Sequence, residues 1–347
     1  MTSILIVTDA WHPQINGVVR SLERTAEELV AMGIKVSFLT PQSFRTLPCP
    51  TYPEIRLSLT MPRRIRRMIG DHDCDHLHIA TEGPLGLMAA QAAVKDGRPF
   101  STSYHTRFPE YLSARLPVPL SWSYAWLRRF HNSGNGCMVA TRSLEDDLRA
   151  RGFKNLMRWS RGVDERLFTP HESSILPDSL KGPVFMYVGR VAVEKNVRAF
   201  LDLDLPGSKV VVGDGPQLDS LRREFASVLF TGAKTGEALA RHYASADVFV
   251  FPSLTDTFGN VMLEALACGV PVAAYPVMGP MDVIADTGAG VLSNDLRQAA
   301  LDCLDIPRDH CRAVAMNYTW RASARQFLDN ALAAQRMFHD ENKAAAA

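Results

Sequence analysis

The chain has 347 residues, of which 46% are hydrophobic and 22% charged, values typical of a soluble globular protein with about two domains. A formal net charge of +1 gives no overall field that would favour nucleic acid. The six cysteines include no CxxC pair, which indicates free thiols in a reducing compartment. The polar residues that follow Ile4–Val7 argue against a signal peptide, and no apolar run is long enough to span a bilayer. We therefore expect a cytoplasmic protein.

Short apolar runs alternate with helical patterns through the first half of the chain. Ile4–Asp9 predicts a buried strand, Ser21–Met32 a helix and Lys35–Thr40 a second strand. Two further strands are expected at His76–Ala80 and Phe100–His105, with a helix between them. This alternation indicates a parallel sheet covered on both faces.

The same alternation begins again in the second half. Strands are expected at Val184–Arg190, Lys209–Gly215, Val228–Ala233, Val248–Ser253 and Val270–Tyr275. The Pro- and Ser-rich segment Thr169–Pro183 is typical of a linker. The predicted fold class is therefore α/β, with two doubly wound, Rossmann-like domains facing across a cleft. The predicted domains are residues 1–172 and 173–318, with a last helix over residues 319–340 that packs back on the first domain.

The loops that follow the second-half strands carry two cations and two acids. Arg190 and Lys195 follow one strand, and the glycine turn Thr257–Val261 opens a helix after another. Two cations and the backbone N–H groups of a helix N-terminus form a site for a diphosphate. Asp256 precedes the turn and Glu264 lies in the helix, so each can accept hydroxyl groups of one sugar. A nucleotide-sugar has this chemistry; alternatively, Asp256 caps the helix and Glu264 is a surface residue.

These motifs resemble the GT-B glycosyltransferases of family 4, and the resemblance extends over nearly the whole chain. It is carried by "VGRVAVEKN", "GDGP", "PSLTDTFGNVMLEALACGVPVAA", "NGVVRSL" and "SYHTRFPEY", and "TEGPLG" is similar to a bacterial branch that acts on lipids. The resemblance implies a retaining reaction in which His105, Arg190 and Lys195 are catalytic. The implied donor-binding residues are Gly17, Asp256, Thr257, Phe258, Gly259, Asn260, Val261 and Glu264. Asp73-Cys74-Asp75 has the DxD pattern with which GT-A enzymes hold a metal on the diphosphate, but here the cations take over that role, so no metal and no cofactor are expected.

Two basic segments have alternative interpretations. The helix predicted over Met61–Gly70 places apolar residues on one face and arginines on the rest, which is typical of a helix on an anionic membrane or of a packed surface helix. The aromatic run Trp122–His131 favours a core helix with basic edges, ahead of a membrane-facing surface or a nucleic-acid site.

The sequence thus predicts a glycosyltransferase, peripheral on the inner face of the cytoplasmic membrane, with no nucleic-acid partner. It would move a sugar from UDP-glucose or UDP-glucuronic acid to a membrane lipid, with diacylglycerol as the expected acceptor and an α-glycosyl lipid as the product. A GDP-mannose-dependent α-mannosyltransferase acting on a lipid or glycan is one alternative. A non-catalytic nucleotide-sugar-binding protein is the alternative from another class.

Overall fold

The computed structural model describes residues 2–14, 17–49, 52–105, 107–113, 118–171, 173–256 and 258–346. The chain forms two compact units, the first of Met1–Ser160 with Trp320–Ala347 and the second of Arg161–Thr319. This boundary differs from the predicted one at residues 172 and 173, because the segment after Ser160 is held by the second unit. The Arg312 guanidinium donates hydrogen bonds to the carbonyl oxygens of Phe168, at 3.1 Å, and Glu165, at 3.3 Å.

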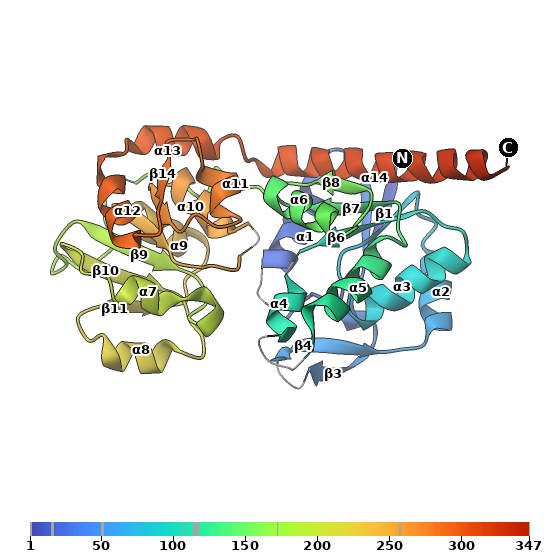
Figure 1. Ribbon diagram of the computed structural model, residues 1–347, viewed down its shortest axis with the longest axis horizontal. Helices are drawn as coiled ribbons and strands as arrows, with labels where there is room; N and C mark the ends of the chain where they lie inside the picture. The colour runs from blue at the N-terminus through green and yellow to red at the C-terminus, as the bar shows by residue number, and fades with distance from the viewer. Residues whose placement is uncertain are drawn as a thin grey trace. The chain divides into compact units, whose positions relative to one another are not determined.

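The first unit is built on a six-stranded parallel sheet with the order β2-β1-β5-β6-β7-β8 (Figure 1). Its strands are β1 (Ser3–Val7), β2 (Lys35–Leu39), β5 (His76–Ile79), β6 (Phe100–Tyr104), β7 (Gly136–Val139) and β8 (Leu156–Arg158). A separate antiparallel hairpin joins β3 (Arg45–Cys49) to β4 (Tyr52–Leu59). Our sequence analysis did not assign β3, β4, β7 and β8.

Successive side chains of β1 enter opposite faces of this sheet, as the two-residue period of a strand requires. Ile4 and Ile6 pack with α1 (Gly17–Ala31) and α14 (Trp320–Ala346) on one face. Leu5 and Val7 pack on the other face with residues of α2 (Pro62–Asp71), α3 (Pro84–Lys95) and α5 (Leu120–His131). The long C-terminal helix therefore completes the first unit's core. The remaining elements are η1 (Pro41–Ser43), α4 (Phe108–Ser113) and α6 (Arg142–Ala150).

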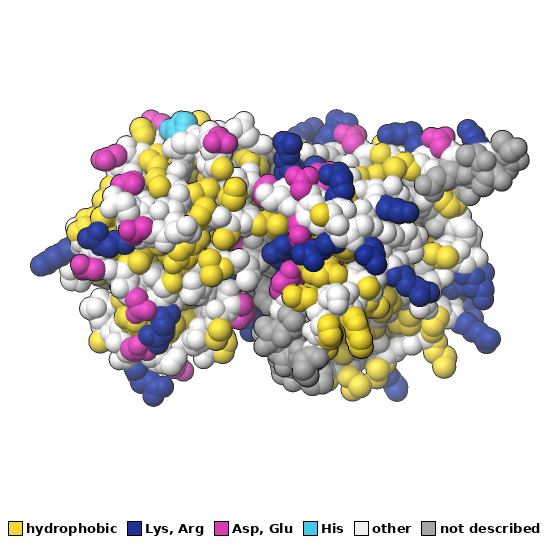
Figure 2. Space-filling model, viewed as in Figure 1, with side chains coloured by type: hydrophobic (Ala, Val, Ile, Leu, Met, Phe, Trp, Pro, Cys, Tyr) yellow, Lys and Arg dark blue, Asp and Glu magenta, His cyan; other side chains and the backbone are white. Residues whose placement is uncertain are grey.

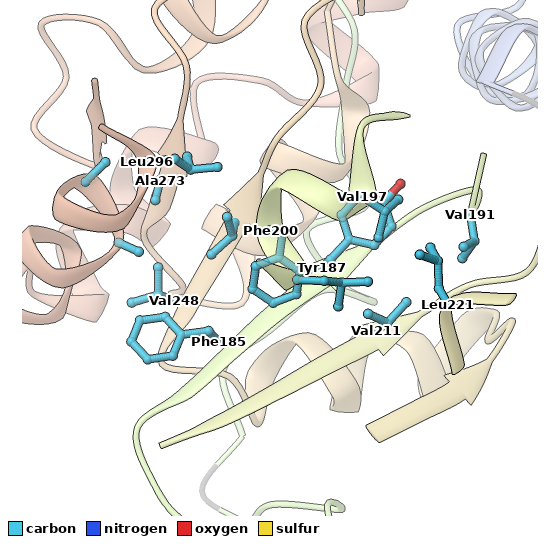
Figure 3. Packing of buried hydrophobic residues seen from close by; sticks show 14 of the residues in the cluster. Phe185, Tyr187, Val191, Val197, Phe200, Val211, Leu221, Val248, Ala273 and Leu296 are labelled. Atoms are coloured by element: carbon cyan, nitrogen blue, oxygen red, sulfur yellow. The ribbon is translucent and has the colours of Figure 1, made fainter. Parts of the chain in front are cut away.

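The second unit has a six-stranded parallel sheet with the order β11-β10-β9-β12-β13-β14. Its strands are β9 (Val184–Val188), β10 (Ser208–Val212), β11 (Leu229–Gly232), β12 (Val248–Phe251), β13 (Val272–Ala274) and β14 (Gly290–Leu292). Its helices are η2 (Val193–Lys195), α7 (Val197–Leu201), α8 (Leu218–Glu224), α9 (Gly236–Ala244), α10 (Asn260–Ala267), α11 (Pro280–Ile284), α12 (Leu296–Asp302), η3 (Cys303–Asp305) and α13 (Arg308–Ala315). Phe185 and Tyr187 of β9 pack with Phe200 of α7 in a buried cluster (Figure 3).

Both sheets are thus parallel and doubly wound, which confirms the predicted fold class for each half of the chain. No helix in the described ranges combines the length and apolarity that crossing a bilayer requires.

Candidate active site

The centre of the second sheet is a topological switch point. β9 lies between β10 and β12. The chain continues from β9 to β10 and β11 on one side, and later forms β12, β13 and β14 on the other side. The loops after β9 and β12 therefore diverge at their carboxyl ends, where open α/β sheets bind ligands. The predicted cations Arg190 and Lys195 lie in the first loop, and the predicted acid Asp256 lies in the second.

Lys195 and Asp256 meet at this point. The Lys195 ammonium group donates a hydrogen bond to Asp256 Oδ1 at 2.5 Å, and both side chains are largely but not fully buried. The adjoining Asn196 takes a left-handed backbone, with φ at 53°, and its side-chain amide donates to the Pro252 carbonyl oxygen at 3.1 Å. The Thr255 hydroxyl donates to the Glu194 carbonyl oxygen at 3.3 Å. Two loops 61 residues apart are thereby joined around one cation and one acid.

Arg190 lies on the same loop, five residues before Lys195, and is exposed to solvent. Its backbone is fixed, because the Tyr187 hydroxyl donates to the Arg190 carbonyl oxygen at 2.8 Å. The structure therefore places both predicted catalytic cations at the carboxyl edge of β9.

The "GDGP" segment packs so closely on this loop that it excludes side chains. A Cβ atom on Gly213 would lie 1.8 Å from the Gly189 carbonyl oxygen, and one on Gly215 would lie 2.4 Å from the Val191 carbonyl oxygen. The Val191 N–H donates to the Asp214 carbonyl oxygen at 2.8 Å. Gly213 and Gly215 are thus required by backbone approach, and they set the shape of the Arg190–Lys195 loop.

Helix α10 begins immediately after the turn that the sequence singled out. Gly259 is its N-cap with φ at 84°, a conformation that disfavours a side chain. The N–H groups of Asn260 and Val261 open the helix at the positive end of its dipole, and the next one, from Met262, donates to the Gly259 carbonyl oxygen at 2.9 Å. Phe258 is buried and packs edge-on against Tyr318 at 6.3 Å, so only its backbone is placed to meet a ligand. Thr257 lies outside the described residues.

Glu264 is inside α10 and buried, with 5% of its surface exposed. The Tyr243 hydroxyl of α9 donates to Glu264 Oε2 at 3.0 Å. The alternative of an exposed surface residue is therefore wrong for Glu264. A buried carboxylate is costly unless it is hydrogen-bonded, and Tyr243 supplies one of the donors.

The first unit has its own switch point, between β1 and β5. Asp9 follows β1, and its carboxylate accepts the backbone N–H groups of Leu85, at 2.8 Å, and Gly86, at 3.0 Å, at the start of α3. Glu82 follows β5 in the "TEGPLG" segment. Burial, reinforced by the negative charge of Asp9, raises the pKa of the Glu82 carboxyl to about 7. A perturbed carboxyl at the carboxyl edge of a sheet is typical of a functional site. Our sequence analysis did not assign Asp9 or Glu82 a role, because their proximity depends on the pairing of β1 with β5.

The other predicted residues of the first unit are Gly17 and His105. Gly17 begins α1 and is exposed, with its carbonyl oxygen accepting the Ser21 hydroxyl at 2.7 Å. His105 follows β6 directly, and its ring lies edge-on to the buried Trp159 at 5.7 Å. Gly17 thus lies at the start of α1 and His105 at the end of β6, and both positions are at the carboxyl edge of the first sheet. Their contacts with a donor or acceptor stay predictions.

Metal ligands are not gathered in the part of the chain that the structure describes, where no group of three or more His, Cys, Asp or Glu could hold an ion. His78, in the histidine-rich segment, is fully buried and contacts the hydroxyls of Ser101 and Ser103 at 2.9 Å each. Its role is therefore structural.

Two parallel, doubly wound units of this kind define the GT-B class of fold. Residues 15–167 match the family model of Glycosyltransferase Family 4, and residues 182–306 match that of Glycosyl transferases group 1. A GDP-mannose-dependent alpha-mannosyltransferase of Mycobacterium tuberculosis (strain CDC 1551 / Oshkosh) is 31% identical over 315 residues, which cover 83% of this chain and 83% of that protein. The chain belongs to glycosyltransferase family 4, and the protein is a glycosyltransferase.

Two further comparisons bear on lipid chemistry and on the fold. An alpha-monoglucosyldiacylglycerol synthase of Streptococcus pneumoniae (strain ATCC BAA-255 / R6) is 26% identical over 93% of this chain and 82% of its own. The crystal structure of Anabaena Alr3699/HepE in complex with UDP and glucose superposes with a TM-score of 0.72 at 17% identity, covering 95% of this chain and 99% of that one. The last comparison confirms the fold.

Proposed function

We propose that this glycosyltransferase moves a hexose or hexuronic acid from a UDP-sugar to the hydroxyl group of diacylglycerol, with retention of configuration. The observation that carries the donor half of the proposal is the Lys195–Asp256 pair at the switch point of the second sheet, beside the N-terminus of α10. A cation, an acid that can accept hydroxyl groups and the backbone N–H groups of a helix N-terminus meet the needs of a nucleotide diphosphate joined to a sugar.

In this reaction the bond between the anomeric carbon and the diphosphate oxygen breaks, and the acceptor oxygen forms the new bond. The acceptor proton passes to a phosphate oxygen of the leaving nucleotide, so no second carboxylate is required. Arg190, Lys195 and the N–H groups near Gly259 and Asn260 would stabilise the charge that develops on the departing diphosphate. Asp256 would accept hydroxyls of the sugar, Glu264 hydroxyls of the ribose, and His105 would support the transition state. We expect no metal and no cofactor to be essential.

The acceptor half of the proposal is supported by the similarity to the diacylglycerol enzyme of S. pneumoniae along most of the chain. It also agrees with the basic surface of α2. Ile65 and Ile69 of this helix are buried in the core, which leaves Arg63 and Arg67 exposed. The arginines would meet anionic lipid on the inner face of the cytoplasmic membrane electrostatically. On the apolar face of the predicted Met61–Gly70 helix, Ile65 and Ile69 pack in the core with residues of α3, whereas Met61 is 73% exposed.

A second candidate donor is GDP-mannose. It is favoured by the M. tuberculosis relative, whose name specifies that donor and whose identity to this chain is higher than that of the diacylglycerol enzyme. The fold and the diphosphate site serve either nucleotide.

Product analysis by mass spectrometry tests the proposal. Purified protein is incubated with diacylglycerol vesicles and UDP-glucose, UDP-glucuronic acid, UDP-galactose or GDP-mannose in separate reactions. A hexosyl or hexuronosyl lipid with one UDP-sugar is the expected result. A product with GDP-mannose alone would replace the donor assignment, and donor hydrolysis without any lipid product would overturn the acceptor. Binding of a donor with neither product formation nor donor hydrolysis would favour the alternative of a non-catalytic nucleotide-sugar-binding protein.

A further inference from the structure

Helix α5 exposes two tryptophans. Trp122 is 72% exposed and Trp126 is 40% exposed, whereas Leu127 and Phe130 of the same helix are buried. The expectation that Trp122–His131 is simply a core helix with basic edges is therefore wrong for its outer face. Trp122, Ala125, Trp126 and Arg129 follow the i, i+3, i+4, i+7 spacing of one helical stripe, and all four are exposed.

The apolar surface continues beyond the two tryptophans. Phe108 of α4 is 39% exposed, and the centroid of its ring lies 6.4 Å from that of Trp126. Tryptophan is costly to leave in water, and large exposed apolar patches mark interaction sites. We call Phe108, Trp122 and Trp126 the aromatic face.

Basic residues accompany the aromatic face on the same helical layer. Phe130 of α5 shares a core cluster with Ile65 and Ile69 of α2, so both helices cover the same side of the first sheet. A cavity of about 650 Å³ between α2 and α3 is lined by four basic residues, Arg63, Arg66, Arg67 and Lys95, and by the acidic residue Asp96. Figure 2 shows basic and hydrophobic side chains close together over α3 and α5. Arg66 is held by Asp96, its Nε donating at 2.6 Å, which fixes one edge of this cavity.

We propose that the aromatic face inserts into the interfacial region of an anionic lipid bilayer while the cations between α2 and α3 contact lipid phosphates. This inference rests on the proposed lipid acceptor. Amphipathic tryptophans concentrate at the level of lipid headgroups, and arginine and lysine are complementary to anionic lipids. The buried apolar residues of α2 cannot insert, so the aromatic face supplies the apolar part of the contact and α2 the charged part.

The two parts respond differently to salt, which makes them separable. Salt screens the attraction between arginines and lipid phosphates, and it leaves insertion of apolar rings nearly unchanged. We therefore expect the wild-type protein to keep part of its vesicle binding at high ionic strength, through the aromatic face.

Flotation of the full chain with vesicles tests the proposal, using phosphatidylcholine with about one third phosphatidylglycerol and no sugar donor. The Trp122→Ala/Trp126→Ala variant is expected to lose at least about tenfold in binding at both low and high salt. The Arg63→Ala/Arg67→Ala variant should lose binding mainly at low salt. Leu304→Ala, which removes an apolar side chain of the second unit with exposure similar to that of Trp126, is the control and should bind like wild type. Trp122→Ala alone covers the case in which the double variant does not fold.

Brominated lipids give a second readout, because they quench tryptophans that enter the bilayer. Quenching that disappears in the double variant supports insertion by the aromatic face. The proposal would be overturned if the folded Trp122→Ala and double variants bound vesicles as well as wild type. It would also be overturned if light scattering showed that the substitutions only convert a dimer to a monomer, because the aromatic face would then be an interface between two copies of the chain. Transfer activity is measured separately on detergent-dispersed diacylglycerol. If the protein binds vesicles through the aromatic face but shows no transfer activity in detergent, the membrane contact stands and the proposed function is wrong. If the protein is active but the variants bind vesicles like wild type, the proposed function stands and the membrane contact is wrong.

Discussion

The ammonium group of Lys195 is hydrogen-bonded to Asp256 Oδ1 at 2.5 Å, and this pair joins the two loops that diverge at the centre of the second sheet. The two residues are those that the sequence assigned to different parts of one substrate, Lys195 to the diphosphate and Asp256 to the sugar. In the structure each neutralises the other. Binding of a donor would therefore exchange one ion pair for contacts with a diphosphate and a hydroxyl group, at a position where both partners are already aligned.

Replacing Lys195 tests the diphosphate assignment. We expect Lys195→Ala to lower kcat/KM for the donor by about 10- to 1,000-fold, because a charge-assisted contact to the leaving group contributes about 1 to 4 kcal/mol in the transition state. The free energy of unfolding should fall by an amount between that of an exposed pair, about 0 to 1 kcal/mol, and that of a fully buried one, about 3 to 5 kcal/mol, because the largely buried Asp256 loses its cation. Steady-state kinetics and a melting curve give both values. The exposed Lys181→Ala is the control, and equal turnover of the two variants would show that Lys195 does not contact the diphosphate.

Tyr243 offers a test of the ribose assignment that leaves the carboxylate of Glu264 in place. Tyr243→Phe removes the hydroxyl that donates to Glu264 Oε2, so a buried carboxylate loses one of its donors. We expect a loss of about 1 to 3 kcal/mol in the free energy of unfolding and a higher KM for the donor. Urea titration and donor kinetics are the measurements. Tyr275→Phe, at a half-buried tyrosine of the same unit, serves for comparison, and an unchanged KM in Tyr243→Phe would argue against ribose binding by an oriented Glu264.

Close backbone packing in the second unit leads to a prediction about two glycines. A Cβ atom on Gly213 would lie 1.8 Å from the Gly189 carbonyl oxygen, whereas one on Gly232 would meet nothing within 4 Å. Both have positive φ, at 154° and 72°. Gly232→Ala should therefore cost only about 1 kcal/mol of backbone strain. Gly213→Ala should cost several times more and displace the Arg190–Lys195 loop, lowering donor affinity. Isothermal titration with UDP and GDP, beside thermal melts, compares the two, and similar melting temperatures would contradict the packing argument.

The parallel α/β class of each half and the position of the donor loops could be predicted from the sequence, whereas the order of the strands and the surfaces could not. Continuous apolar strands such as Ile4–Val7 have only one environment available, a sheet covered on both faces, so their pattern determined the fold. Helices α2 and α5 have two possible environments for each face. Their periodicity showed which residues share a face, but only packing showed that Ile65 and Ile69 turn inward while Trp122 and Trp126 turn outward.

Glu82 was missed for a related reason. Its significance depends on Asp9, which is 73 positions earlier in the sequence and becomes its neighbour only because β1 and β5 pair. The histidines nearest to Glu82 in the sequence, His76 and His78, lie in β5 and are buried, so the local sequence does not single out this carboxyl group. The double-carboxylate arrangement at the first switch point therefore appears only when the order of strands is known.

The raised pKa of Glu82 predicts a pH dependence of stability. Burial, and then the charge of Asp9, raise this pKa from 4.5 in the unfolded chain to about 7 in the folded protein. The folded state thus favours the protonated carboxyl, so its contribution is complete below pH 4.5 and is lost as pH rises through about 7. Glu82→Gln keeps a neutral side chain at every pH. We expect the variant to gain stability relative to wild type between pH 4.5 and 8, by about 2 kcal/mol after allowance for partial exposure. Urea titrations at pH 4.5, 6 and 8 measure this gain, with Glu237→Gln on the second unit as control. Parallel pH profiles for wild type and Glu82→Gln would show that Glu82 ionises normally in the folded protein.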